Sequence, residues 1–180
     1  MEDSPRLKIK TPSGFFKLGE TYCLGFNNTI YLHLGPDWGF NLCITLLLLS
    51  STLFFILFMA PKVGLYLQIL GFFIYPTNLI SYLLTALKNP GIILNPWELE
   101  LEEGNNKANI CKICDVLIEP ESEHCFDCQI CVRGYDHHCP LSGKCIGSGN
   151  ILPFYSFLLF TFASFVYFGV WFFIVYTNPH

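Results

Sequence analysis

Three long runs of apolar residues without a charged side chain divide the chain. They cover residues 39–60, 63–87 and 151–176 and are 22, 25 and 26 residues long. A helix needs about 20 apolar residues to cross the hydrocarbon core of a bilayer. The alternative, buried helices of a soluble core, typically shows shorter runs with a polar face, and too little chain remains outside the runs to bury all three. The pattern therefore predicts an α-helical polytopic membrane protein with three transmembrane helices.

The composition agrees with this class and excludes several others. Hydrophobic residues make up 52% of the 180 residues and charged residues 13%, about half of the ~25% that is usual in soluble domains. These values are not those of a disordered tail, a collagen or a coiled coil. The net charge of −4 offers no general attraction to nucleic acid. We therefore expect a membrane, and no nucleic acid, among the partners.

The basic residues are distributed unevenly between the two sides of the predicted spans. Nine of the ten Lys and Arg residues fall in segments 1–38 and 88–150, and Lys62 alone lies between the first two runs. Loops rich in Lys and Arg stay in the cytosol, so we expect a cytosolic N-terminal segment, 1–38, and a cytosolic cysteine-rich domain, 88–150. The Asn-Asn-Thr triplet at 27–29 is a glycosylation sequon that would require a lumenal N-terminus, and we give it less weight than the charges.

Seven of the nine cysteines lie close together in the second of these segments. Thiols paired two residues apart, with histidines between the pairs, are typical of tetrahedral Cys3His zinc sites. A disulfide framework is the alternative, but a cytosolic segment stays reduced and seven thiols leave one unpaired. The candidate ligands are Cys111, Cys114, His124, Cys125, Cys128, Cys131, His137, His138, Cys139 and Cys145.

Two tetrahedral zinc sites would use eight of these ten ligands. One cysteine and one histidine would remain, which is the minimum pair for an activated thiol nucleophile. Asp136 directly precedes the paired histidines and could orient an imidazole as a third member. The spacing alone does not determine which cysteine is free.

The segment from Cys111 to Phe154 resembles the cysteine-rich domain of the Asp-His-His-Cys (DHHC) protein palmitoyltransferases. These are multipass membrane enzymes that attach long-chain fatty acids to protein cysteines through a thioester. Two triplets outside the segment are also similar to family motifs: Asn89-Pro90-Gly91 resembles Asp-Pro-Gly after the second span, and Gly35-Pro36-Asp37 precedes the first span as in some members. The matching residues within the segment are the cysteine pattern, Asp136-His137-His138-Cys139-Pro140, Cys145, Gly147, Asn150 and Phe154.

The resemblance implies a role for each of these side chains. Cys139 would be the nucleophile, His137 the general base, and Asp136 the residue that holds the imidazole. Because the implied ligand sets interleave, we expect metal binding to stabilise a segment with almost no hydrophobic core of its own. Two structural Zn2+ ions are implied, one bound by Cys111, Cys114, His124 and Cys131 and the other by Cys125, Cys128, His138 and Cys145.

The implied activity is that of a protein S-palmitoyltransferase. A fatty acyl-CoA such as palmitoyl-CoA gives its acyl group to Cys139, and a juxtamembrane cysteine of a membrane-associated substrate protein then receives it. The resemblance also implies a location in an endomembrane (ER or Golgi) or the plasma membrane, and a homo-oligomer is a further expectation.

Departures from the family pattern keep an alternative open. Leu141 stands where Trp is usual, Lys144 stands where Asn is common, and the segment before His124 is acidic where the family is basic. The family usually has four spans and three are seen here, so we expect the chain to lack the fourth transmembrane helix. The alternative is a catalytically inactive zinc-binding membrane adaptor, or a truncated gene product, of the same family. An unrelated zinc module, such as one of the ubiquitin-ligase type, would leave no spare cysteine and histidine.

Overall fold

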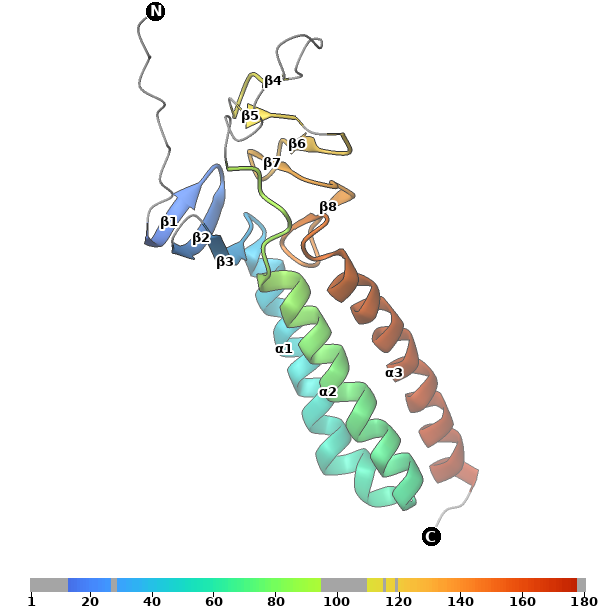
Figure 1. Cartoon of the computed structure of the whole chain (residues 1–180). Helices are drawn as coiled ribbons and strands as arrows, with labels where there is room; N and C mark the ends of the chain where they lie inside the picture. The colour runs from blue at the N-terminus through green and yellow to red at the C-terminus, as the bar shows by residue number, and fades with distance from the viewer. Residues whose placement is uncertain (1–12, 27–28, 95–109, 115, 119, 178–180) are drawn as a thin grey trace, which may run out of the picture.

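The computed structural model describes residues 13–26, 29–94, 110–114, 116–118 and 120–177. Three long helices form one part of the molecule, and small antiparallel sheets lie at one end of them (Figure 1). Asn27 and Asn28 of the sequon lie outside the described residues, as do the basic residues Arg6, Lys8, Lys10 and Lys107.

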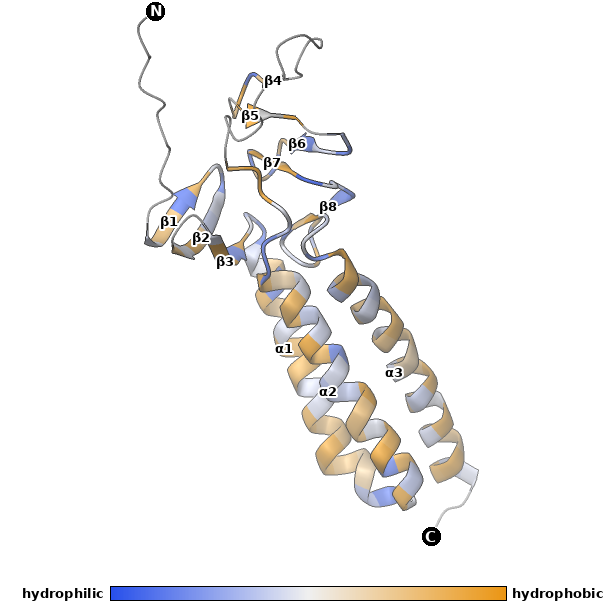
Figure 2. Cartoon of the chain, viewed as in Figure 1, coloured by the Kyte–Doolittle hydropathy of each residue, from blue (hydrophilic) through white to orange (hydrophobic). Residues whose placement is uncertain are grey.

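The three apolar runs form helices. These are α1 (Trp38–Phe54), α2 (Leu65–Leu87) and α3 (Ile151–Thr177). Two short turns, η1 (Phe55–Met59) and η2 (Ala60–Lys62), continue α1. All three helices are long and apolar enough to cross a membrane, and apolar residues cover much of their surface (Figure 2). The predicted fold class, a helical membrane protein with three spanning helices, is therefore confirmed.

Helix α2 packs against both of the other helices. In the first half of α2, the ring of Tyr75 stacks on Phe55 of η1 with centroids 4.8 Å apart. Tyr167 of α3 meets both rings edge-on. The hydroxyl of Thr161 in α3 donates a hydrogen bond of 3.0 Å to Asn78 Oδ1 in α2. Lipid tails are as apolar as these side chains, so close packing and such hydrogen bonds hold the helices together.

The start of α1, the end of α2 and the start of α3 all lie at the end of the bundle that carries the sheets (Figure 1). The connection between α1 and α2, which contains Lys62, lies at the opposite end. The N-terminal sheet and the cysteine-rich module therefore share one side of the helical bundle.

The N-terminal segment contains a three-stranded antiparallel sheet that the sequence reasoning did not predict. Its strands are β1 (Gly14–Leu18), β2 (Thr21–Phe26) and β3 (Thr29–Leu34), in that order. The turn after β1 contacts the cysteine-rich module, where Glu20 N donates to Cys128 O at 2.9 Å. Gly19 in this turn has φ 55°, and a Cβ there would lie 2.4 Å from Gln129 O. Only glycine fits so close an approach.

Three short antiparallel hairpins form the cysteine-rich module. They pair β4 (Ile110–Cys111) with β5 (Val116–Leu117), β6 (Glu123–Cys125) with β7 (Ile130–Val132), and β8 (His137–Cys139) with β9 (Lys144–Ile146). The chain enters this module from α2 through residues 89–94, which run beside β7.

The expectation that segment 88–150 has almost no hydrophobic core of its own is wrong, because most residues of a small core come from this segment. Ile130 and Val132 of β7 are buried together with Ile92, which follows the Asn-Pro-Gly triplet. Cys23 and Ile30 from the N-terminal sheet complete the same cluster. The core was missed because part of it comes from a sheet more than 50 residues earlier in the chain.

Candidate functional site

Two groups of four ligand side chains come together in the cysteine-rich module. Adjacent residues of a strand point to opposite faces, and His124 and Cys125 at the end of β6 accordingly belong to different groups. Pairing of the strands places His124 opposite Cys131, and His138 opposite Cys145. The interleaved order along the chain follows from this hairpin geometry. The first group is Cys111, Cys114, His124 and Cys131, and the second is Cys125, Cys128, His138 and Cys145, the two sets that the resemblance implies.

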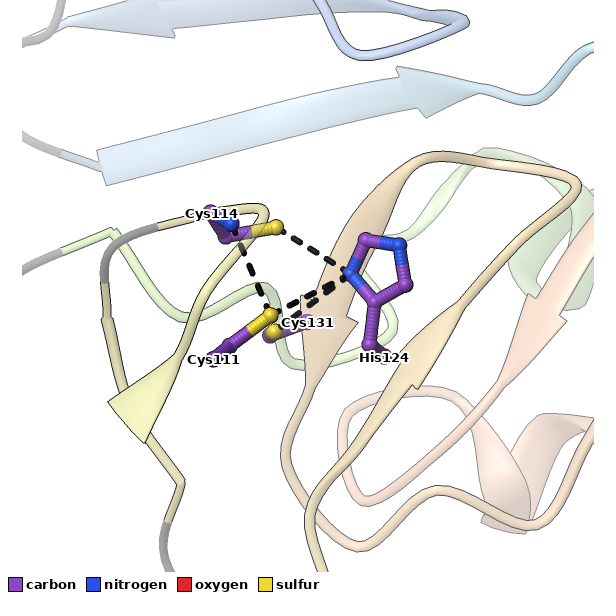
Figure 3. A group of neighbouring side chains, drawn as sticks. All are labelled: Cys111, Cys114, His124 and Cys131. Carbon is purple, nitrogen blue, oxygen red and sulfur yellow. Dashed lines mark hydrogen bonds between the residues drawn. The ribbon is translucent and has the colours of Figure 1, made fainter. Parts of the chain in front are cut away.

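In the first group, one nitrogen of His124 faces three sulfur atoms (Figure 3). Nδ1 lies 3.6 Å from Cys111 Sγ, 3.2 Å from Cys114 Sγ and 3.7 Å from Cys131 Sγ. The backbone N–H of Cys114 points at Cys111 Sγ over 3.5 Å. A hydrogen bond donated to sulfur favours the thiolate, which is the form that binds metal.

In the second group, one histidine nitrogen likewise faces three sulfur atoms. His138 Nδ1 lies 3.5 Å from Cys125 Sγ, 3.4 Å from Cys128 Sγ and 3.9 Å from Cys145 Sγ. The backbone N–H of Cys128 points at Cys125 Sγ over 3.4 Å. The other ring nitrogen of His138, Nε2, lies 2.8 Å from Asp37 Oδ2 at the start of α1.

Both groups have the geometry of a zinc site. With Zn–S near 2.3 Å and Zn–N near 2.0–2.1 Å, a tetrahedral ion separates sulfur from nitrogen by about 3.6 Å. The six separations between sulfur and Nδ1 run from 3.2 to 3.9 Å. Three thiolates and one imidazole fill all four positions of a tetrahedron, which is the donor set of closed, structural zinc sites. Two Cys/His groups that could hold metal ions are therefore present.

Asp136, His137 and Cys139 stay outside both groups. His137 and Cys139 are two residues apart on β8 and so share one face of the strand, whereas His138 between them points to the other. His137 Nδ1 lies 2.9 Å from Asp136 Oδ2. The ring of Phe154, in the first turn of α3, meets the imidazole with centroids 5.3 Å apart. One face of β8 therefore carries a buried thiol and an imidazole whose Nδ1 lies against a carboxylate, the residue types from which an activated thiol nucleophile is built.

Contacts from the helix ends hold the hairpin that carries Cys139. Tyr82 of α2 donates its hydroxyl proton towards Leu141 O at 2.8 Å, and Asn41 Nδ2 of α1 donates to Ser142 O at 3.3 Å. Sequence reasoning missed both residues. Their only signal was a polar group inside an apolar run, which is expensive in lipid unless it has a partner.

Lys144, one of the departures from the family pattern, is a fully buried residue of this hairpin. Its ammonium donates hydrogen bonds to the backbone carbonyls of His33, in β3, and Lys88, at the end of α2. Burial lowers the pKa of Lys144 to about 7. This lysine joins the N-terminal sheet, α2 and the cysteine-rich module at one point.

The fold and the site together define a helical membrane protein with a cysteine-rich domain of two Cys3His groups and a separate Cys-His-Asp set. Residues 104–180 match the family described as DHHC palmitoyltransferase. The chain thus carries a DHHC palmitoyltransferase-family domain, and the resemblance seen in its motifs is confirmed.

Curated relatives carry the same class of name. The chain is 27% identical over 152 residues to palmitoyltransferase ZDHHC9 of Homo sapiens, covering 67% of this chain and 42% of the relative. It is 29% identical over 149 residues to palmitoyltransferase ZDHHC18-B of Danio rerio, covering 66% and 38%. It is 31% identical over 164 residues to "Probable protein S-acyltransferase 6" of Arabidopsis thaliana, covering 71% and 39%. The chain thus spans about two-fifths of the length of these relatives.

Proposed function

We propose that this protein is a protein S-acyltransferase that moves a palmitoyl-type group from acyl-CoA to a cysteine of a membrane-associated protein. One observation carries the proposal: the two metal-type groups take six of the seven clustered cysteines and two of the three histidines, and leave Cys139 and His137 on one strand face. A module built only for structure has no need of such a pair. The names of the relatives point to the same reaction.

The reaction would proceed in two half-reactions. Cys139 Sγ, its proton taken by His137, attacks the thioester carbonyl carbon of acyl-CoA; a new C–S bond forms, the bond to the CoA sulfur breaks, and CoA leaves as a thiol with that proton. The substrate cysteine then attacks the acyl-enzyme, gives its proton to His137, and Cys139 leaves as a thiol. Asp136 would hold the imidazole throughout and stabilise its protonated form.

The two metal sites would be structural and would hold zinc through the eight ligands named above. Zinc, when bound, would fix the three hairpins against one another and supply no step of the transfer. Contacts of the Cys139 hairpin with Tyr82, Asn41 and Asp37, and that of its own Lys144 with Lys88 O, would then keep it on the helix ends, close to the surface of the bilayer.

We further propose that the end of the bundle with the sheets faces the cytosol, in an endomembrane (ER or Golgi) or the plasma membrane. The supporting observation is that Lys17, Lys88, Lys112 and Arg133 all lie in segments at that end, whereas Lys62 is the one basic residue of the described segments at the other. Acyl-CoA and substrate proteins with juxtamembrane cysteines would meet the site there. A second copy of the chain is a further proposed partner.

Labelling with an alkyne palmitoyl-CoA tests the proposal. The zinc-loaded protein in detergent should acquire a label that neutral hydroxylamine removes, because hydroxylamine cleaves thioesters. Cys139→Ser should lose this hydroxylamine-sensitive label. Cys43→Ser is the matched control, since Cys43 is an exposed thiol of α1 that could react without catalysis. An unlabelled wild type with normal zinc content would instead support the inactive adaptor, and a label that persists in Cys139→Ser would refute the role of Cys139.

A further inference from the structure

Asp37 occupies an unusual position between the first helix and the second metal-type group. It is the residue that precedes α1, where an aspartate normally accepts a hydrogen bond from a backbone N–H of the first turn. Here the Asp37 side chain makes no such bond, and the backbone N–H of Phe40 reaches the Asp37 carbonyl instead. The carboxylate is directed to His138, with Oδ2 2.8 Å from Nε2.

This contact determines which nitrogen of His138 carries the proton. An ionised carboxylate only accepts hydrogen bonds, so Nε2 must donate and Nδ1 is left with its lone pair towards the three sulfurs. Ligand histidines held this way by a carboxylate have a fixed tautomer and ring orientation. The His138 side chain is only 10% exposed, whereas the Asp37 side chain is 37% exposed, so the histidine is shielded from water and the carboxylate is in part open to it.

The first metal-type group provides an internal comparison. His124 also presents Nδ1 to three sulfurs, but its Nε2 is buried and has no hydrogen-bond partner among the residues that the structure describes. The Phe126 ring packs against this imidazole at a steep angle, with centroids 5.1 Å apart. The two groups have the same donor atoms and differ in the support of the histidine.

The backbone around Asp37 is also in contact with the hairpin of the nucleophile. Gly143, in the turn between β8 and β9, has φ 73°, and a Cβ there would lie 2.8 Å from Asp37 O. His138 directly precedes Cys139 on β8. The backbone before α1 and the hairpin that carries Cys139 therefore pack directly against each other.

We propose that Asp37 is a positioning residue that orients His138 and makes the second metal site the more retentive of the two. Asp37 lies outside the matched family segment, 104–180, and belongs to the Gly-Pro-Asp triplet before the first span. The inference rests on the zinc binding proposed above, because its effect is an effect on metal retention.

The test uses the full chain, loaded with zinc in detergent and exposed to increasing concentrations of EDTA. Freed thiols are then trapped with N-ethylmaleimide and identified by mass spectrometry, which reports each cysteine separately. In the wild type, the thiols of the first group (Cys111, Cys114, Cys131) should react at lower EDTA than those of the second (Cys125, Cys128, Cys145). In Asp37→Asn the second group should react at about 10- to 100-fold lower EDTA, the usual effect of losing a residue that supports a metal ligand, while the first group stays unchanged.

Asp127→Asn is the matched control. It removes the same charge beside Cys128, from an exposed side chain outside the hydrogen bond to His138, and the order of reaction should stay as in the wild type. If Asp37→Asn behaves like this control, or if the first group is the more retentive in the wild type, the inference is overturned. If Asp37→Asn exposes all six thiols without EDTA, Asp37→Glu is measured in the same way. Selective protection of the second group in Asp37→Glu supports the inference, and exposure of all six thiols in this variant too overturns it. A wild type that binds no zinc would instead refute the proposed metal sites themselves.

Discussion

Asn150 forms hydrogen bonds to three parts of the molecule, and its replacement by aspartate should weaken the contacts between them. The residue directly precedes α3 and is fully buried. Its Oδ1 accepts a hydrogen bond from Gly147 N at 2.9 Å, and its Nδ2 donates to Thr85 O in α2 and to Cys145 O in β9, each at 3.1 Å. One amide thus links two helices to the hairpin of the second metal-type group.

The substitution Asn150→Asp keeps the shape and the acceptor but removes both donated hydrogen bonds. It also places a carboxylate oxygen against two carbonyl oxygens. Each buried carbonyl that loses its partner costs about 1–3 kcal/mol, so we expect a loss of about 2–6 kcal/mol in the free energy of unfolding. In a chain of this size, a loss of about 1 kcal/mol in the free energy of unfolding lowers the melting temperature by about 2–4 °C. The apparent melting temperature should therefore fall by at least about 4 °C.

Asn89→Asp is the matched control. Asn89 Oδ1 accepts from Gly91 N and Ile92 N, each at 2.9 Å, and an aspartate would keep both bonds. Asn89→Asp should therefore leave the melting temperature of the protein nearly unchanged. Circular dichroism and zinc release, followed during heating in detergent, measure both variants. The reasoning fails if Asn150→Asp melts like the wild type or if Asn89→Asp is destabilised equally.

Two further predictions concern the packing of the helices. A Cβ on Gly71 would lie 2.3 Å from an aromatic ring of η1, so Gly71→Ala should lower the free energy of unfolding by about 1–3 kcal/mol through overpacking. A Cβ on Gly169 would have nothing within 4 Å, so Gly169→Ala should not lower the melting temperature. Equal effects of the two substitutions would contradict this packing. Thr161→Val removes the hydrogen bond to Asn78 between α3 and α2 and should cost about 0.6–2 kcal/mol in unfolding by SDS. Ser164→Ala removes only a bond within α3 and should cost less, so the reverse order would count against the interhelical bond.

The features that could be predicted from the sequence depend on local or one-dimensional properties. The three spans follow from run length, because the thickness of a bilayer dictates how many apolar residues a helix needs. The Cys-x2-Cys pairs are recognisable because each closes over about one turn of chain, as the short N–H···S contacts of Cys114 and Cys128 show. Both the spans and the cysteine pairs can therefore be recognised without knowing any contact between residues that are distant in the chain.

The features that were missed all depend on distant contacts. The sheet of 14–34 consists of short strands that gain their core from Ile92, Ile130 and Val132, far along the chain. Six of the eight buried residues of this cluster belong to the cysteine-rich segment, but they are spread from residue 92 to residue 145 and form no continuous apolar run. Short strands of this kind have weak sequence signals because packing against neighbours decides their stability.

The sequence by itself determined a membrane protein with two Cys/His ligand sets and one cysteine and one histidine to spare. The spacing of the residues left their division open and the family resemblance implied one, but only the tertiary structure gives its physical reason: strand alternation directs His138 to a metal-type group and leaves His137 on the face of Cys139. The tertiary structure also decided what supports them: Asp37 and Asn41 reach their partners across 101 positions of the chain, and Lys144 reaches His33 across 111. Such pairings carry no local pattern, because they exist only once the helix ends and the hairpins have come together.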